Sequence, residues 1–457
     1  MLASVLSVHC EVIIMTPSSA APASRIVAYV GLDWADQQHV VCWRAADSTQ
    51  LPSAVVRQQP EPLRAWVAEL RQRFPQGLIA MALEQSRGPV IAALMHYDFL
   101  QLYPINPKSL ARYRETFFSS GAKDDPGDAA LLLDLLVKHR EQFSPWVPDD
   151  ALSRQLALRV EHRRQLVDLR TALIQQLSSH LKLYFPQALD WAGELDSLLA
   201  CDFLQRWPTL GAVQQARPAQ LEQFYHQPHC RRSHLIQERL QQIQQARPLT
   251  EDPALVEASS QMVLALVAQL RVLTSTLEQW QDEINRLFAR HPDAFIFASF
   301  PAAGPVFAPR LQAAFGSRRE RFGAAQDLLQ FSGVAPVTRR SGKSRQVHRR
   351  WARPKFLHQS FVEFAALSLP HGGWARALYL QLRARGHRHW AAFRVIAFRG
   401  VRILFRCWQD RVPYKESKDL ESLQRRNPRL WEASQQLPPR KTAASSKPLV
   451  EKTVKAL

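Results

Sequence analysis

Four acidic residues stand where a sheet and a helix could bring their carboxylates together. Asp33 and Glu84 each end an apolar run that predicts a strand, and Asp125 and Asp128 open a segment that predicts a helix. Carboxylates at the ends of neighbouring strands can converge at one edge of a sheet, and a helix that begins there can add two more. Such hard oxygen ligands suit Mg²⁺ or Mn²⁺. Paired ions of this kind, about 4 Å apart, promote phosphoryl transfer, so the four acids predict a metal site for that chemistry.

Each acid also has a structural alternative. Asp33 could be a turn residue and Glu84 a surface acid, while Asp125 and Asp128 could cap the helix that they open. Taken singly, these alternatives are favoured, whereas the ordered set of four favours the metal site. Three further acids lie nearby and are treated as spare: Asp36, Asp124 and Asp134.

A serine beside a glycine is the second candidate for chemistry. Ser341 precedes Gly342 near the start of the segment 339–355, which contains eight Lys and Arg in 17 residues. A serine on a basic loop can approach a phosphodiester, although its hydroxyl needs a base or a metal to activate it. On the residues alone, a phosphate-gripping loop in which the serine only donates a hydrogen bond is the favoured alternative. Ser344 and, more distantly, Ser332 compete for the same role.

The elements that must position these residues divide the chain into five parts. We expect an α/β domain in which strands alternate with helices, followed by a helical middle, a mainly helical block that contains the serine, and a basic tail. The boundaries are 1–24 for a disordered leader, 25–145, 146–290, 291–412 and 413–457 for the disordered tail. Within the first domain the expected strands are 25–32, 40–45, 78–83 and 100–105, and the expected helices are 62–74, one from Val90 and one from Asp125.

The helical middle contains two leucine-rich periodic segments. In the first, leucines recur at spacings of three and four from Leu166 to Leu181. The second alternates these spacings without a break, which predicts a coiled-coil hairpin or a dimerising arm, with a plain two-helix core as the alternative. Its apolar positions are Val263, Leu266, Leu270, Leu273, Leu277, Trp280, Ile284 and Leu287.

The positive charge is confined to one part of the chain. The formal net charge is +19, yet from Arg339 to the end there are 27 Lys and Arg against 7 Asp and Glu, so the remainder is nearly neutral. Such an asymmetry points to a polyanion, nucleic acid before membrane. The turn at Phe300–Gly304 and the amphipathic helix 390–408 are further candidate phosphate contacts. The predicted nucleic-acid-binding residues are Arg339, Arg340, Lys343, Arg345, Arg349, Arg350, Arg394 and Arg402.

Several other classes of protein are disfavoured. The five cysteines are scattered and odd in number, which argues against a disulfide framework or zinc ribbon and fits a reducing cytoplasm. No apolar run reaches the length of a membrane span, and we expect no membrane partner. The sequence contains neither a Walker loop nor a dinucleotide fingerprint.

The order of these motifs resembles the insertion-sequence-110 family of DEDD transposases. The resemblance covers roughly residues 25–140 and 290–412. It rests on the two strand-ending acids, the Lys-x-Asp-x-x-Asp-Ala pattern at 123–129, the Pro-x-x-Gly-Pro turn at 301–305, and Phe-Ser-Gly-Val-Ala-Pro at 331–336 followed by Ser341. The family differs at Ala302, where a glycine is usual, and at Asp124, where a small polar residue is common.

The resemblance implies a fold and a mechanism. The first domain would be RNase H-like, of the Holliday-junction-resolvase type, and its four acids would bind divalent metal. Ser341 would be the nucleophile that forms a phosphoserine link to DNA, with the two halves of the site supplied by different protomers of a dimer or tetramer. A structured RNA from the element would select donor and target DNA by base pairing. A bacterial cytoplasm, next to the nucleoid, would be its location.

Three functions follow as hypotheses from different classes. The first is a transposase or recombinase that uses both the acids and Ser341. The second is a structure-specific nuclease that uses the acids and water. The third is a nucleic-acid-binding scaffold without catalytic activity.

Overall fold

The computed structural model describes residues 25–84, 87–117, 125–226, 233–342, 344–371 and 373–437. Its contacts divide the chain into two compact units, residues 1–148 and 149–457. The expected leader 1–24, the end of the expected tail and Lys343 lie outside the described residues. The finer five-part division of the chain stays a prediction.

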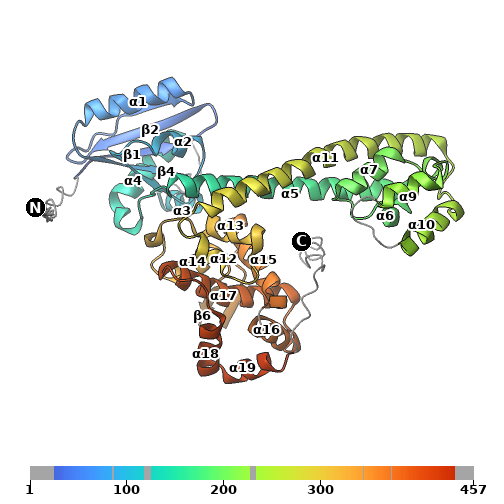
Figure 1. Ribbon diagram of the computed structural model, residues 1–457. Helices are drawn as coiled ribbons and strands as arrows, with labels where there is room; N and C mark the ends of the chain where they lie inside the picture. The colour runs from blue at the N-terminus through green and yellow to red at the C-terminus, as the bar shows by residue number, and fades with distance from the viewer. Residues whose placement is uncertain are drawn as a thin grey trace, which may run out of the picture. The chain divides into compact units, whose positions relative to one another are not determined.

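The first unit is built on a mixed five-stranded sheet (Figure 1). The strand order is β3-β2-β1-β4-β5, in which β1 pairs antiparallel with β2 and parallel with β4. The mixed α/β prediction is confirmed, and the RNase H-like assignment stays a prediction. The strand β3 was not predicted, because its short sequence SAVVR alternates weakly. The strands are β1 Ile26–Asp33, β2 Gln38–Ala45, β3 Ser53–Arg57, β4 Leu78–Leu83 and β5 Leu100–Pro104.

The two faces of the sheet are covered by different helices. Successive strand residues point to opposite faces. Val30 and Leu32 of β1 belong to an apolar core with residues of α1 and α2. On the other face, Ala80 and Ala82 of β4 pack with residues of α3 and α4. The helices are α1 Pro60–Arg73, α2 Pro89–Leu94, α3 Pro107–Phe117 and α4 Asp125–His139, with a 3-10 turn at Arg140–Gln142.

Gly31 lets α4 lie directly against β1. A Cβ atom at Gly31 would stand 2.0 Å from the carbonyl oxygen of Ala129 and 2.7 Å from the amide nitrogen of Leu133. Both obstacles are helix backbone, which cannot rotate aside. The glycine therefore fixes how closely the start of α4 approaches the strand that ends at Asp33.

Gly31→Ala is expected to destabilise the first unit by about 3 kcal/mol, since overpacking a tight contact costs roughly 1–3 kcal/mol and backbone obstacles lie at the upper end. Thermal unfolding followed by circular dichroism measures this effect. Gly211→Ala is the control, because a Cβ there meets nothing within 4 Å. Equal melting temperatures for the two variants would contradict the proposed backbone contact.

Two long helices of the second unit form an antiparallel pair (Figure 1). The end of α5 packs with the start of α11 in one core, while the start of α5 packs with the end of α11 in another. A helical insertion lies between them in the chain, as expected. These elements are α5 Ala151–Tyr184, α6 Ala188–Trp191, α7 Leu198–Arg206, α8 Leu210–Gln214, α9 Pro218–His226, α10 Ser233–Gln245 and α11 Pro253–Ala289.

The periodic apolar positions of α11 form its buried stripe. Val263, Leu270 and Ile284 are at most 1% exposed. In α5 the periodicity holds less well, since Leu169 is 50% exposed. By length and composition α11 could also span a membrane, but its apolar stripe is already covered by α5 and the insertion. A supercoiled geometry stays a prediction.

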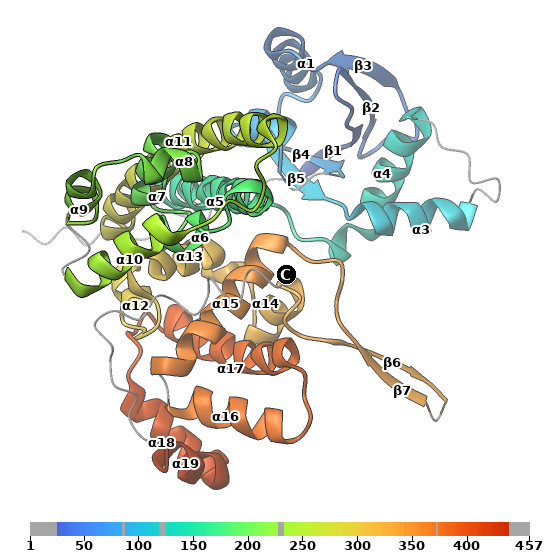
Figure 2. The same ribbon diagram turned by 90° about the vertical axis from the view of Figure 1, so that its right-hand side faces the viewer.

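The remaining elements form a mainly helical body with one exposed β-hairpin. Figure 2 shows β6 and β7 as a ribbon that extends away from the helices of this body. The elements are α12 Ala294–Ala298, α13 Gly304–Phe315, a 3-10 turn at Arg319–Arg321, α14 Ala325–Phe331, β6 Val337–Ser341, β7 Ser344–His348, α15 Lys355–His371, α16 Gly373–Ala384, α17 His389–Gln409, α18 Glu416–Arg426 and α19 Pro428–Gln435.

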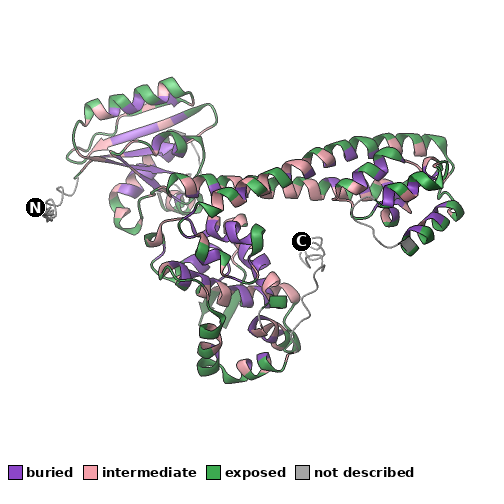
Figure 3. Cartoon of the chain, in the orientation of Figure 1, coloured by how far each residue is buried: buried purple, intermediate pink, exposed green. Residues whose placement is uncertain are grey.

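The prediction of a disordered tail from residue 413 is wrong for its first part. The helices α18 and α19 occupy this stretch, and each contributes a leucine to the core of the body: Leu423 is 1% and Leu430 is 2% exposed. Figure 3 shows these short helices as mostly exposed, with a few buried or half-buried positions. The high charge of the segment concealed this amphipathic spacing.

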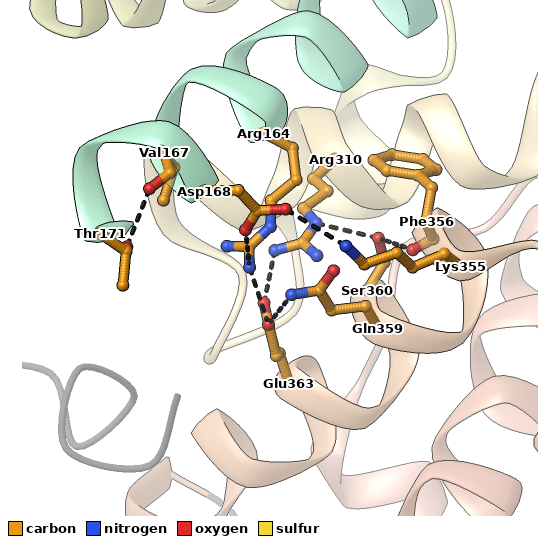
Figure 4. A network of polar contacts seen from close by, with 10 residues as sticks. All are labelled: Arg164, Val167, Asp168, Thr171, Arg310, Lys355, Phe356, Gln359, Ser360 and Glu363. Atoms are coloured by element: carbon orange, nitrogen blue, oxygen red, sulfur yellow. Dashed lines mark hydrogen bonds and ion pairs between the residues drawn. The ribbon is translucent and has the colours of Figure 1, made fainter. Parts of the chain in front are cut away.

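A buried ion-pair network fixes α5 to the helical body (Figure 4). Arg310 of α13 lies 2.6 Å from the Glu363 carboxylate of α15 and donates a hydrogen bond of 2.9 Å to Ser360. Arg164 of α5 lies 4.0 Å from Glu363 on its other side. Since Arg310 and Glu363 are both nearly inaccessible, each charge depends on the other.

Glu363→Ala is expected to destabilise the second unit by about 3–5 kcal/mol, because it leaves the Arg310 guanidinium buried without its counter-ion. Denaturant unfolding of the full chain measures the change. The exposed pair of Arg406 and Asp410 in α17 offers a control. Arg406→Ala should change stability by less than about 0.5 kcal/mol, and a similarly small effect at Glu363 would overturn the argument.

Candidate active site: an acidic sheet edge and a serine hairpin

Asp33 and Glu84 stand side by side at one edge of the sheet. Leu32 of β1 pairs with Leu83 of β4 in parallel register, so the next residue on each strand is one of the predicted acids. Asp33 lies two residues after Gly31 in β1, so its side chain points to the same face of the sheet as Gly31, which faces α4. Ala82 of β4 packs on that same face, and Glu84 directly follows the end of β4. The two strands therefore end beside each other at one edge of the sheet, and the convergence of the two carboxylates stays a prediction.

The start of α4 brings Asp128 to the same face. Asp128 directly precedes Ala129, whose carbonyl contacts Gly31. Its carboxylate is buried, with 2% of the residue exposed, and Asp33 is 8% exposed. Arg114 of α3 is a cation partner of Asp128: its Nε donates a hydrogen bond of 2.9 Å, and its terminal nitrogen forms an ion pair with the same oxygen.

The described side chains do not form the predicted metal site. Asp125 begins α4, so its backbone stands one helical turn before Asp128, but its side chain lies outside the described residues. Among the described side chains, no group of three or more His, Cys, Asp or Glu is close enough to hold a metal ion. The chemistry of the donors fits a hard cation, and Arg114 already supplies Asp128 with one positive partner.

The spare acids have other surroundings. Asp134 accepts a hydrogen bond of 2.7 Å from Tyr113 and lies 2.9 Å from the ammonium of Lys138. Burial and the bond to Asp134 raise the pKa of Tyr113 to about 12. Asp36 is exposed between β1 and β2, and Asp124 lies outside the described residues.

Ser341 lies at the tip of the β6–β7 hairpin. It pairs with Ser344 in the strand register. Gly342, which follows it, has φ +55°, a left-handed conformation that favours glycine. The prediction of a loop at Ser341 is thus wrong in detail, because the flanking residues form strands. All the described residues of the hairpin from Thr338 on are exposed.

The hairpin is strongly cationic. Arg340 lies directly opposite Arg345 in the register, and like charges so placed destabilise a strand pair. Neither residue has an ion pair with a described carboxylate. A two-stranded ribbon is also marginally stable alone. An arrangement of this kind gains stability when an anion lies across it.

The other predicted nucleic-acid-binding residues have mixed exposure. Arg339, Arg349 and Arg402 are exposed, whereas Arg350 and Arg394 are half-buried. The amphipathic helix 390–408 is confirmed as α17.

The turn before α13 has apolar surroundings. Phe300 stacks on Tyr414 with ring centroids 4.7 Å apart. A small cavity beside the turn is lined mainly by apolar side chains, including Ala302 and Trp374. These neighbours offer little to a phosphate, so no contact is assigned there.

Two residues of the site were missed by the sequence analysis. Arg114 was not singled out, because its pairing with Asp128 depends on how α3 folds against α4. Trp351 is 77% exposed, and the Arg349 guanidinium lies 5.1 Å from its ring centroid. A tryptophan between arginines, in the sequence RRWAR, was the available signal for the second.

Comparison with known proteins decides the family. A DEDD transposase family of the IS110 type matches residues 30–186, and the transposase IS116/IS110/IS902 family matches residues 294–380. Together they cover more than half of the chain, and they contain Asp33 and Ser341 respectively. The chain belongs to the IS110 family of DNA transposases. Its DEDD domain indicates the use of divalent metal.

Relatives of this IS110-family transposase align over most of its length. The "Mini-circle putative transposase for IS117" of Streptomyces coelicolor is 29% identical over 86% of this chain and 96% of its own length. The "Insertion element IS900 uncharacterized 42 kDa protein" of Mycobacterium paratuberculosis is 23% identical over 84% of this chain and 96% of its own length. The "Insertion element IS110 uncharacterized 43.6 kDa protein" of S. coelicolor is 25% identical over 80% and 89%.

Proposed function

We propose that this transposase moves an insertion sequence by cleaving DNA through Ser341 and rejoining the strands with help from the acidic sheet edge. The observation that carries the proposal is the pairing of two features in one chain. One is a set of acids, Asp33, Glu84 and Asp128, at the carboxyl ends of β1 and β4 and in the first turn of α4. The other is an exposed cationic hairpin with a serine at its tip.

The acids would hold Mg²⁺ or Mn²⁺. Asp33, Glu84 and Asp128 supply oxygen donors from the sheet edge, and Asp125 would add a fourth from the start of α4. A divalent ion bound by them supplies stabilisation for the charge that develops on phosphate oxygens during transfer. Arg114 positions Asp128 by pairing with its carboxylate.

Ser341 would act as the nucleophile. Its Oγ forms a bond to phosphorus while the bond from phosphorus to the deoxyribose oxygen breaks, and the serine proton passes to that leaving oxygen. Rejoining reverses the exchange: a sugar hydroxyl attacks phosphorus and the serine oxygen leaves. The phosphoserine link conserves the energy of the phosphodiester between the two steps. Arg339, Arg340, Lys343 and Arg345 would hold the strand beside it.

The partners are donor and target DNA and, by resemblance to the family, a structured guide RNA that pairs with both. A dimer or tetramer would let the acids of one protomer act with the serine of another. We place the protein in the bacterial cytoplasm near the nucleoid. The basic excess after residue 338 supports a nucleic-acid partner.

A strand-exchange assay separates this function from a metal-dependent nuclease. The purified chain, Mg²⁺, donor and target duplexes and RNA transcribed from the element's non-coding end are incubated together. A transposase yields joined recombinant strands. A nuclease yields only free cleaved ends, which would overturn the proposal in favour of hydrolysis by the acids alone, and no product at all would leave only the non-catalytic scaffold.

A further inference from the structure

The root of the β6–β7 hairpin carries a cluster of three arginines, Arg349, Arg353 and Arg394, that no acid balances. His358 lies beside them. None of the three arginines forms an ion pair with a carboxylate of a described residue. The sequence has no acidic residue at all between Asp327 and Glu363. Uncompensated guanidinium groups held together repel one another, so the cluster is expected to attract an anion.

The side chains of the cluster perturb one another. Burial, and then the positive charges of Arg353 and Arg349, lower the pKa of His358 to about 4. Burial and the charge of Arg349 likewise lower the pKa values of Arg353 and Arg394. The buried Nδ1 atom of His358 has no hydrogen-bond partner among the described residues. These groups come from the hairpin's root, α15 and α17, so three segments converge there.

An aromatic platform adjoins the cluster. Trp351 is the most exposed large hydrophobic residue in the described part of the chain, at 77%. The Arg349 guanidinium lies 5.1 Å from its ring centroid, which links the indole to the cationic cluster. A single exposed apolar side chain is common on protein surfaces, so it is the adjoining arginines that suggest a ligand for Trp351. An indole stacks well on a nucleic-acid base, provided that the base is not already stacked between neighbouring bases.

We propose that the hairpin root binds one unpaired nucleotide, whose phosphate is held by Arg349, Arg353 and Arg394 and whose base stacks on Trp351. This inference rests on the proposed function, because an unpaired nucleotide arises where a strand is cleaved, exchanged or paired with a guide. The ligand is a single-stranded polynucleotide segment, and its source is either a DNA strand or RNA. The residues that bind the nucleic-acid strand begin a few residues after Ser341 in the sequence.

Binding of 2-aminopurine oligonucleotides to the full chain tests the proposal. The probes are single-stranded DNA, single-stranded RNA of the same sequence and duplex DNA. Emission of the single-stranded probe should fall on binding, as it does when the base stacks. Trp351→Ala should remove this fall and weaken single-strand binding about 5- to 100-fold, while duplex binding changes less than about twofold. Trp351→Phe should retain most of both signals.

The salt dependence of binding tests the phosphate contacts. Each of Arg349→Ala and Arg394→Ala should reduce the slope of log affinity against log salt by about 0.7 for single strands. Phe295→Ala is the matched control for Trp351→Ala, because it removes an aromatic side chain that is 49% exposed on α12. Trp351→Leu, which keeps apolar bulk, and thermal melting separate a lost stack from a lost fold.

The outcomes are distinct. Loss of quenching at Trp351→Ala with DNA, RNA or both supports the proposal and identifies the strand. Unchanged quenching, or equal weakening of single-strand and duplex binding in a folded variant, overturns it. Ser341→Ala should bind and quench as the unaltered chain does, so this readout survives even if the serine is not the nucleophile.

Discussion

Ser341→Ala is expected to abolish the covalent adduct between protein and DNA and to reduce strand exchange by at least about 10⁴-fold. Removing a covalent nucleophile eliminates the intermediate itself, and such losses elsewhere reach about 10⁶-fold. The side chain is exposed at the end of β6, so the fold should survive its truncation. Incubation with labelled DNA, followed by denaturing electrophoresis, measures the adduct.

Ser344→Ala is the matched control for this prediction. Ser344 pairs with Ser341 in the strand register and is also exposed. Both substitutions remove one hydroxyl from the hairpin tip, so a shared effect on hairpin folding would appear in both. Loss of the adduct at Ser344 and its retention at Ser341 would reverse the assignment of the nucleophile.

Asp128→Asn is expected to reduce DNA cleavage by at least about 10³-fold, the scale on which loss of one group that stabilises transition-state charge reduces rates. The amide keeps the shape of the side chain but loses the negative charge that would hold a divalent ion. Because Arg114 then faces a neutral partner, DNA binding should persist or rise slightly. Cleavage rates measured across a Mg²⁺ titration, beside binding by fluorescence anisotropy, separate the two effects.

Asp36→Asn provides the comparison for Asp128→Asn. Asp36 is a nearby acid of the same unit that is exposed between β1 and β2. Its removal alters the net charge equally and should leave cleavage within about twofold. Equal losses for both variants would point to a general electrostatic effect, and the sheet edge would then have no special role.

The elements that position the acids were largely predictable because each carries a strong local signal. The strand ending at Asp33 is continuously apolar, as expected for a strand covered on both faces, and Pro126 marks the start of α4. What sequence could not supply is the close contact at Gly31. It depends on which helix crosses the strand, and only the folded arrangement determines that.

The structure around Ser341 was predicted less well than the elements that position the acids. Glycine and basic residues predicted a loop at Ser341, yet the alternating Thr338–Ser341 and Ser344–His348 form a hairpin with no apolar face. Strand prediction relies on a buried side, which this ribbon lacks. The exposed Trp351 was likewise passed over, since burial cannot be read from an isolated tryptophan. The high charge of the segment after residue 413 likewise led to a prediction of disorder where the helices α18 and α19 form.

The central claim is that Ser341 becomes covalently linked to DNA in a reaction that needs the acids of the sheet edge. Mass spectrometry of the peptide that contains Ser341, after reaction with DNA and nuclease trimming, tests it most directly. We predict a nucleotide-bearing Ser341 peptide in the unaltered chain with Mg²⁺ and an unmodified peptide in Asp128→Asn. Cleaved DNA accompanied by an unmodified Ser341 peptide in the unaltered chain would contradict the claim.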